Sequence, residues 1–145
     1  MAGPWRLMPM EATMEKQLTA LLVMNHERRS VLAGHLVSLD ATVLTAGSCG
    51  DAARVLYDEP EVRLVVTDLV LPDGSWFDVL NRVGDARSDA AVVVAARVAD
   101  ERLWTQVLEA GGFDLLVEPY QGREVQRILA AATTPHLHHR LAAAS

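Results

Sequence analysis

The stretch that decides the fold spans residues 65–74 and reads Val65-Val66-Thr67-Asp68-Leu69-Val70-Leu71-Pro72-Asp73-Gly74. It belongs to a short apolar run that starts at Leu64, of the kind found in strands buried on both faces of a sheet. The run ends at Asp68, so a carboxylate is expected at the rim of the sheet, where α/β folds bind ligands. Pro72 and Gly74 predict a tight loop before the next helix. A simple turn-capping role for Asp68 is the alternative.

Strand and helix patterns alternate on both sides of this stretch. Five short apolar or β-branched runs predict strands, at residues 20–24, 42–46, 64–67, 91–95 and 115–117. Such alternation predicts an α/β unit, in which a parallel sheet has helices on both faces and right-handed crossovers. The carboxyl ends of the strands converge on one edge, so five residues that follow strands are expected there: Asn25, His26, Asp68, Ala96 and Glu118.

Helix signals lie between these runs. A helical face is formed by Leu32, Leu36 and Leu39. Ser48 with Asp51 resembles a capping pair, and Asp100 is a good N-cap for a helix that Gly111 and Gly112 end. Two further helices are predicted from apolar spacing, one at Phe77, Leu80 and Val83, the other at Val125, Ile128 and Leu129.

Composition limits the class of protein. The chain has 145 residues, half of them apolar, and a formal net charge of −6. That length suits one domain with a proper core, and the charge argues against direct nucleic-acid binding. No apolar run reaches membrane-spanning length, and residues 1–17 lack the apolar segment of a signal peptide. We therefore expect a cytoplasmic protein with a loosely ordered lead-in at 1–17, a domain at 18–132 and a tail at 133–145.

The order of the elements and three motifs resemble a response-regulator receiver domain. The motifs are Thr67–Gly74, Leu108–Asp114 and Glu118-Pro119-Tyr120, the last being similar to the family's Lys-Pro-aromatic ending. The resemblance covers residues 18–132. It implies a chemotaxis-regulator-like, flavodoxin-like fold, with a five-stranded parallel sheet of order 2-1-3-4-5.

The resemblance also implies a chemistry for Asp68. This carboxylate would accept a phosphoryl group from a partner histidine kinase or phosphotransfer protein. A carboxylate is a competent nucleophile when the phosphoryl charge is neutralised and the reacting groups are in line. Asp68 and the backbone carbonyl of Val70 would be ligands of Mg²⁺, and the Glu118-Pro119 peptide bond would be cis.

The metal site departs from the family pattern. The family's two acidic residues after the first strand correspond here to Asn25 and His26. Mg²⁺ prefers oxygen ligands in octahedral geometry, which an imidazole does not provide. Glu27 is adjacent, but we expect it on the first turn of the following helix, where negative charge is favoured. His26 is interpreted as a solvent-facing residue at the helix start, so the metal site is predicted to be weak or absent.

The phosphoryl site departs as well. Glu118 replaces the family's lysine, Ala95 and Ala96 flank the position of its hydroxyl residue, and Leu115 stands for its switch aromatic. This count gives two carboxylates and no lysine, to which a phosphoryl group adds about two negative charges. A like-charge pair at ~4 Å costs on the order of 4 kcal/mol at an effective dielectric of about 20. We therefore predict a degenerate receiver, which keeps the fold and Asp68 but not the usual switch.

The expected function is that of a stand-alone receiver, not an enzyme, which binds a histidine kinase or phosphotransfer protein and a downstream protein. The stand-alone reading rests on the dozen residues that follow the last helix. Partners would bind the face that carries Trp104, Leu115 and Tyr120, for which ordinary packing is the alternative. A constitutive, phosphorylation-independent binding module is the runner-up, and a homodimer is left open.

Two other classes are less favoured. A phosphohydrolase with Asp68 as nucleophile usually has a second acid two residues later, where this chain has Val70. A flavodoxin-like cofactor binder needs a phosphate-cradling loop after the first strand, which residues 25–28 do not offer.

Four further features have no assigned chemistry. Cys49 lies near a helix start, which could lower its pKa, but we interpret it as inert. Trp76 either shields the Asp68 pocket or covers the core. Trp5 is in the lead-in, and a cluster of tail histidines is interpreted as a solvated segment rather than a metal site: His136, His138 and His139.

Overall fold

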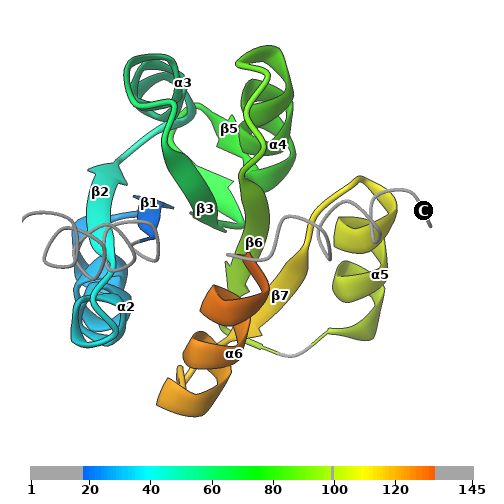
Figure 1. Cartoon of the computed structure of the whole chain (residues 1–145). Helices are drawn as coiled ribbons and strands as arrows, with labels where there is room; N and C mark the ends of the chain where they lie inside the picture. The colour runs from blue at the N-terminus through cyan, green and yellow to red at the C-terminus, as the bar shows by residue number, and fades with distance from the viewer. Residues whose placement is uncertain (1–17, 99, 133–145) are drawn as a thin grey trace, which may run out of the picture.

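Five parallel strands form the central sheet, in the order β2-β1-β3-β6-β7 (Figure 1). The computed structural model describes residues 18–98 and 100–132. The strands are β1 Thr19–Val23, β2 Thr42–Ala46, β3 Val62–Asp68, β6 Ala91–Ala96 and β7 Asp114–Val117. Counted along the sheet's own strands, this is the predicted order 2-1-3-4-5. The predicted lead-in and tail, with Trp5 and the three tail histidines, lie outside the described residues.

Helices cover both faces of the sheet, as the alternating pattern predicts (Figure 1). They are α2 His26–Ser38, α3 Cys49–Asp58, α4 Trp76–Asp85, α5 Glu101–Glu109 and α6 Gly122–Ala132. One core cluster joins α2 and α6 to one side of the sheet, and two clusters join α3, α4 and α5 to the other. Alternate β1 residues serve the two sides: Ala20 and Leu22 face α2 and α6, and Leu21 and Val23 face the opposite layer. Burial on both faces explains why β1 is apolar without alternation.

The central strand β3 places Asp68 in the middle of the carboxyl edge. It pairs with β1 on one side and β6 on the other, with Thr67 opposite Val23 and Asp68 opposite Ala95. The chain that leaves β1 therefore passes beside Asp68. The Glu118-Pro119 peptide bond after β7 is cis, as the family resemblance implies.

The loop after Asp68 forms a β-hairpin rather than a simple turn. Two short strands, β4 Val70–Leu71 and β5 Gly74–Ser75, form an antiparallel hairpin. At its tip the Asp73 carboxylate accepts hydrogen bonds from the backbone N–H groups of Cys49 and Gly50, at 2.7 and 3.0 Å. These bonds lower the pKa of Asp73 and tie the hairpin to the start of α3.

The predicted capping residues are confirmed, whereas the predicted buried face of α4 is wrong only at Phe77. Ser48 and Asp100 cap α3 and α5 through their side chains. In α4 the buried pair is Val79 and Val83, and Phe77 is 48% exposed. Val79 and Val83 are four residues apart and so share one face, which leaves Phe77 on the other side of the helix.

The two glycines after α5 have different physical reasons. Gly111 has φ of 105°, a left-handed conformation that favours glycine at a helix end. Gly112 lies against the helix, because a Cβ there would be 2.5 Å from Val107 Cγ1 and 2.9 Å from the Val107 carbonyl oxygen. Since one of these contacts is with backbone, it cannot be relieved by a side-chain rotation.

Gly112→Ala is therefore expected to lower the free energy of unfolding by about 1–3 kcal/mol, through overpacking. Gly34→Ala is the matched control, because Gly34 lies within α2 with open space around its Cβ position. Alanine there should raise helix stability by about 0.5–1 kcal/mol. Urea unfolding of the two variants and the parent measures both effects. Equal stabilities of the parent and Gly112→Ala would contradict the predicted clash.

Candidate functional site

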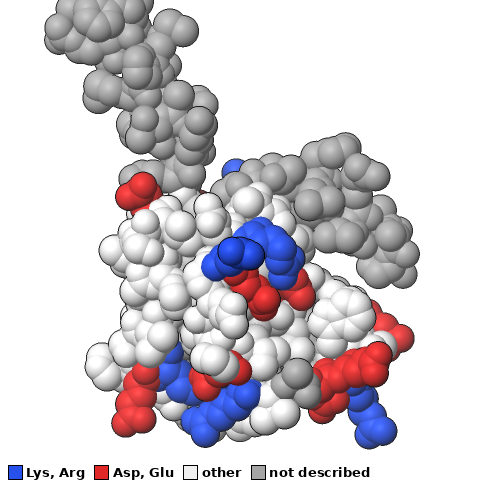
Figure 2. Space-filling view, turned by 90° about the horizontal axis from the view of Figure 1, so that it is seen from below, with Lys and Arg blue, Asp and Glu red and all other residues white. Residues whose placement is uncertain are grey.

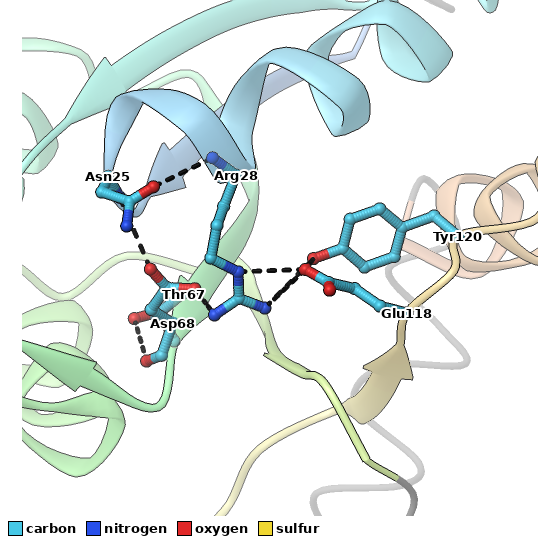
Figure 3. A network of polar contacts seen from close by, with 6 residues as sticks. All are labelled: Asn25, Arg28, Thr67, Asp68, Glu118 and Tyr120. Carbon is cyan, nitrogen blue, oxygen red and sulfur yellow. Dashed lines mark hydrogen bonds and ion pairs between the residues drawn. The ribbon is translucent and has the colours of Figure 1, made fainter.

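Asp68 is a buried carboxylate at the carboxyl end of the central strand. Its side chain is 7% exposed. The backbone N–H of Asn25 donates to Oδ2 at 3.4 Å, and Arg28 Nη1 lies 2.5 Å from Oδ1 (Figure 3). The neighbouring Thr67 hydroxyl donates to the Asp68 carbonyl oxygen, not to the carboxylate. The Asp68 carboxylate thus lies next to a guanidinium rather than in open water.

Arg28 connects Asp68 to the end of β7. Its Nη2 lies 2.9 Å from Glu118 Oε2, and its Nε donates to the same oxygen at 3.0 Å (Figure 3). Nη2 also lies 3.5 Å from the Tyr120 hydroxyl, which donates to Glu118 Oε2 at 3.3 Å. One guanidinium therefore bridges two carboxylates that come from β3 and from the β7–α6 connection.

The start of α2 explains why Arg28 reaches this site. Asn25 is the N-cap, and its Oδ1 accepts a hydrogen bond from the Arg28 backbone N–H at 2.9 Å. Arg28 then precedes the buried residues Leu32 and Leu36 by four and eight positions. Residues at this spacing share one helical face. Arg28 is therefore the first residue of the inner face of α2, directly over the carboxyl edge of the sheet.

Burial and charge act against each other in this network. Burial raises the pKa of Asp68, the Arg28 charge and the Asn25 N–H oppose the rise, and Glu118 adds to it. Burial alone would lower the pKa of Arg28, but the charge of Asp68 and the contact with Tyr120 leave it raised. Arg28 therefore stays cationic, and Asp68 is the group whose charge is costly.

The charge count made from the sequence needs correction. It assigned two carboxylates and no cation to the pocket, whereas Arg28 contacts both carboxylates. The rim is therefore less anionic than predicted. Sequence reasoning missed Arg28 because it considered the residues that directly follow strands, and the spacing of Arg28 to Leu32 and Leu36 was the available signal.

The other predicted site residues surround Asp68 to different degrees. A cavity of about 660 Å³ lies over the carboxylate. Among its lining residues are Asn25, Arg28, Val70, Ala96 and Arg97. Ala95 is buried beneath it, opposite Asp68 in the sheet. His26 and Glu27 are exposed on the first turn of α2, and Glu118 and Pro119 line a second cavity beside Arg28.

These residues do not fit a Mg²⁺ ion well. Within the described residues, no group of three or more His, Cys, Asp or Glu side chains is placed to hold a metal. The Asn25 Oδ1 that could be an oxygen ligand caps the helix instead, and Asp68 Oδ1 already lies against Arg28. The positive charge next to Asp68 is thus supplied by a side chain of the chain itself.

The predicted partner face also needs correction. Leu115 and Tyr120 are each only 8% exposed, because Leu115 packs under α5 and the Tyr120 ring joins the core beneath α2 and α6. The Tyr120 hydroxyl points into the Arg28 network (Figure 3). Trp104 is 45% exposed and lines a shallow cavity with Leu115 and Val117.

Cys49 and Trp76 both pack against the core. Cys49 is buried, and burial with the nearby Asp73 carboxylate raises the pKa of its thiol to about 11, which disfavours the reactive thiolate at neutral pH. Trp76 packs on the cluster beneath α5 and meets Phe77 edge to face, with 5.8 Å between ring centroids.

The surface drawn in Figure 2 carries charges of both signs. On the face drawn in Figure 2, basic side chains lie directly against acidic ones, with uncharged residues around them. That mixture differs from the continuous basic patch typical of nucleic-acid binding.

None of the helices between residues 18 and 132 that the structure describes is long and apolar enough to span a membrane.

Known response regulators are similar in sequence to this chain. No family model matches the chain. It is 32% identical over 123 residues to the DNA-binding transcriptional regulator NtrC of Azospirillum brasilense, matching 79% of this chain but only 25% of that protein. It is 28% identical over 105 residues to the two-component response regulator ORR11 of Oryza sativa subsp. japonica, matching 70% of this chain and 71% of that protein.

Solved structures share the fold. A putative response regulator from Chloroflexus aurantiacus superposes with a TM-score of 0.74 at 19% identity, over 81% of this chain and 98% of that one. The receiver domain of the sensor histidine kinase PA1611 from Pseudomonas aeruginosa, which has a magnesium ion coordinated in its active-site cleft, gives a TM-score of 0.70 at 22% identity. That alignment also covers 81% of this chain and 98% of the other.

Proposed function

We propose that this chain, which is a response-regulator receiver domain, accepts a phosphoryl group at Asp68 and signals by binding other proteins. The observation that carries the proposal is the buried carboxylate at the end of β3, which faces a cavity of about 660 Å³. Oδ1 of Asp68 is buried against Arg28, whereas Oδ2 accepts a long hydrogen bond, 3.4 Å, from the Asn25 N–H, so we take Oδ2 as the oxygen that attacks phosphorus. The role we propose is that of a signalling module rather than an enzyme.

The donor we propose is the phosphohistidine of a histidine kinase or phosphotransfer protein. A carboxylate oxygen of Asp68 forms the new bond to phosphorus, and the bond between phosphorus and the histidine nitrogen breaks. The nitrogen keeps the electron pair. The chain's contribution is to orient the carboxylate and to offset charge, which is how most phosphoryl-transfer sites work. Arg28 is placed for the second task, since it already contacts Asp68.

Incubation with acetyl phosphate and Mg²⁺, followed by intact-mass analysis, tests this function. We expect one phosphoryl adduct on the parent and none on Asp68→Asn. Asp89→Asn is the matched control, because Asp89 is exposed at the opposite, amino end of the sheet strands and should not affect labelling. Labelling of Asp68→Asn to the level of the parent would contradict the assignment of Asp68.

A second function is favoured by one specific observation. The guanidinium of Arg28 lies against the carboxylate that would be the nucleophile. If that pair stays closed, the domain acts as a constitutive binding module whose surface does not depend on phosphorylation. Absence of an adduct on a folded parent, together with unchanged partner binding by Asp68→Asn, would favour this second function over the first.

A further inference from the structure

We infer that the Arg28 guanidinium takes the place of a divalent cation in this pocket, so that Asp68 is held and charge-balanced without Mg²⁺. The inference refines the proposed function and rests on it for the role of Asp68. It concerns a residue of α2 that no motif of the sequence singled out. Metal binding to this pocket can be measured whether or not Asp68 is phosphorylated.

The position of the guanidinium is the first observation. Arg28 is anchored on both sides, at 2.5 Å from Asp68 Oδ1 and at 2.9 and 3.0 Å from Glu118 Oε2. Its side chain is 14% exposed, so water screens its charge only weakly. A Mg²⁺ ion must lie about 2.1 Å from each oxygen that it coordinates. At Asp68 Oδ1 it would be pressed against the guanidinium, and the repulsion of two cations opposes that arrangement.

The available oxygens are the second observation. Mg²⁺ needs near-octahedral coordination, and sites that hold it usually supply at least one or two carboxylates. Here Glu118 is bound to Arg28, and the Asn25 Oδ1 caps α2. Glu27 is exposed on the first turn of that helix. A metal on Asp68 Oδ1 would thus have to displace Arg28, which would leave Glu118 without its cation.

Arg28 and Arg97 together suit the charge of a phosphoryl group. Arg97 lines the same cavity, and its charge acts on Asp68 in the same direction as that of Arg28. With acetyl phosphate as donor, an Asp68 oxygen bonds to phosphorus, the bond from phosphorus to the acetyl oxygen breaks, and acetate leaves with the electron pair. Guanidinium N–H groups match phosphoryl oxygens in geometry and charge, so these two side chains can stabilise the adduct.

A Mg²⁺ titration followed by ¹H–¹⁵N NMR tests the inference. The probes are the Asn25 amide, which donates to Asp68, and the Arg28 Nε–H, which donates to Glu118. In the parent, both signals should respond to MgCl₂ only as they do to NaCl of equal ionic strength. In Arg28→Met, the Asn25 amide should shift saturably, at MgCl₂ concentrations at least about tenfold below the highest concentration at which the parent still shows no specific shift. Arg54→Met removes an exposed arginine that pairs with Asp51 on α3, away from this cavity, and should behave like the parent.

The parent alone can overturn the inference, so the test does not depend on how well Arg28→Met folds. A saturable Mg²⁺ shift of Asn25 with a simultaneous change of the Arg28 Nε–H signal would show that metal displaces the guanidinium. Acetyl phosphate labelling in EDTA gives a second readout, which should match labelling in Mg²⁺ within about twofold. Strict dependence on Mg²⁺ overturns the inference, whereas absence of labelling in both buffers counts against the phosphoacceptor proposal and leaves the NMR result to decide the metal question.

Discussion

Arg28→Met should lower the free energy of unfolding by about 3 kcal/mol at neutral pH, near the lower end of the range for removing one partner of a buried ion pair. The lower end applies because Glu118 is 32% exposed and can regain water, whereas Asp68 is 7% exposed and cannot. Methionine keeps the length and apolar stem of the side chain, so most of the loss reflects charge. Urea unfolding at several pH values measures it.

The pH dependence of this loss has a definite sign. Burial raises the pKa of Asp68 above its ordinary value, so its carboxyl group favours the folded state below the ordinary pKa of about 4. That contribution is lost as the pH rises through the raised folded value. Without Arg28 the pKa of Asp68 should rise further. The difference in free energy of unfolding between the parent and Arg28→Met should therefore be small at acid pH and increase toward neutral pH.

Two further variants separate this effect from a general loss of charge. Arg54→Met removes an arginine whose pair with Asp51 is mostly exposed, at 3.6 Å, and should cost at most about 0.5 kcal/mol. Arg28→Met combined with Asp68→Asn removes both partners and should be more stable than Arg28→Met alone, since no unpaired buried charge remains. A double variant as unstable as the sum of the single ones would show that Arg28 and Asp68 do not interact.

The fold was predictable because each β-strand carries its own signal. β3 is an apolar run that ends in a carboxylate, and the helix that follows β6 has Asp100 as its cap and the glycine pair at its end. These signals are local, so the chain's order of elements determines the sheet. Local spacing also found the buried face of α2, although it assigned Phe77 to the core when Val79 was the buried residue.

The electrostatics of the site could not be obtained in the same way. The ends of the strands alone predict that Glu118 is a like charge beside Asp68. The residue that decides their interaction comes from a helix turn and reaches the edge through a long side chain. Tyr120 shows the same limit, because an aromatic residue after a strand can as well turn inward when its hydroxyl finds partners.

Glu118→Gln should speed phosphoryl labelling of Asp68 by at least about tenfold, equivalent to about 1.4 kcal/mol of barrier. Glu118 shares the charge of Arg28 with Asp68, and its own charge contributes to raising the pKa of Asp68. Glutamine keeps an oxygen that can accept from Arg28 Nε but removes the negative charge. More of the guanidinium charge then acts on Asp68 and on the incoming phosphoryl group, which carries about two negative charges. The rate of adduct formation with acetyl phosphate, followed by intact mass, measures the effect.

Glu27→Gln is the control for this change. Glu27 is exposed on the first turn of α2, one residue before Arg28, and lines the same cavity as Glu118. Its substitution changes the net charge equally but leaves the Arg28 contacts in place, so the labelling rate should change by less than about twofold, as expected for a screened surface charge. Slower labelling of Glu118→Gln would mean that Glu118 mainly positions Arg28 over Asp68. The charge of Glu118 would then assist the acceptor through Arg28 instead of opposing it.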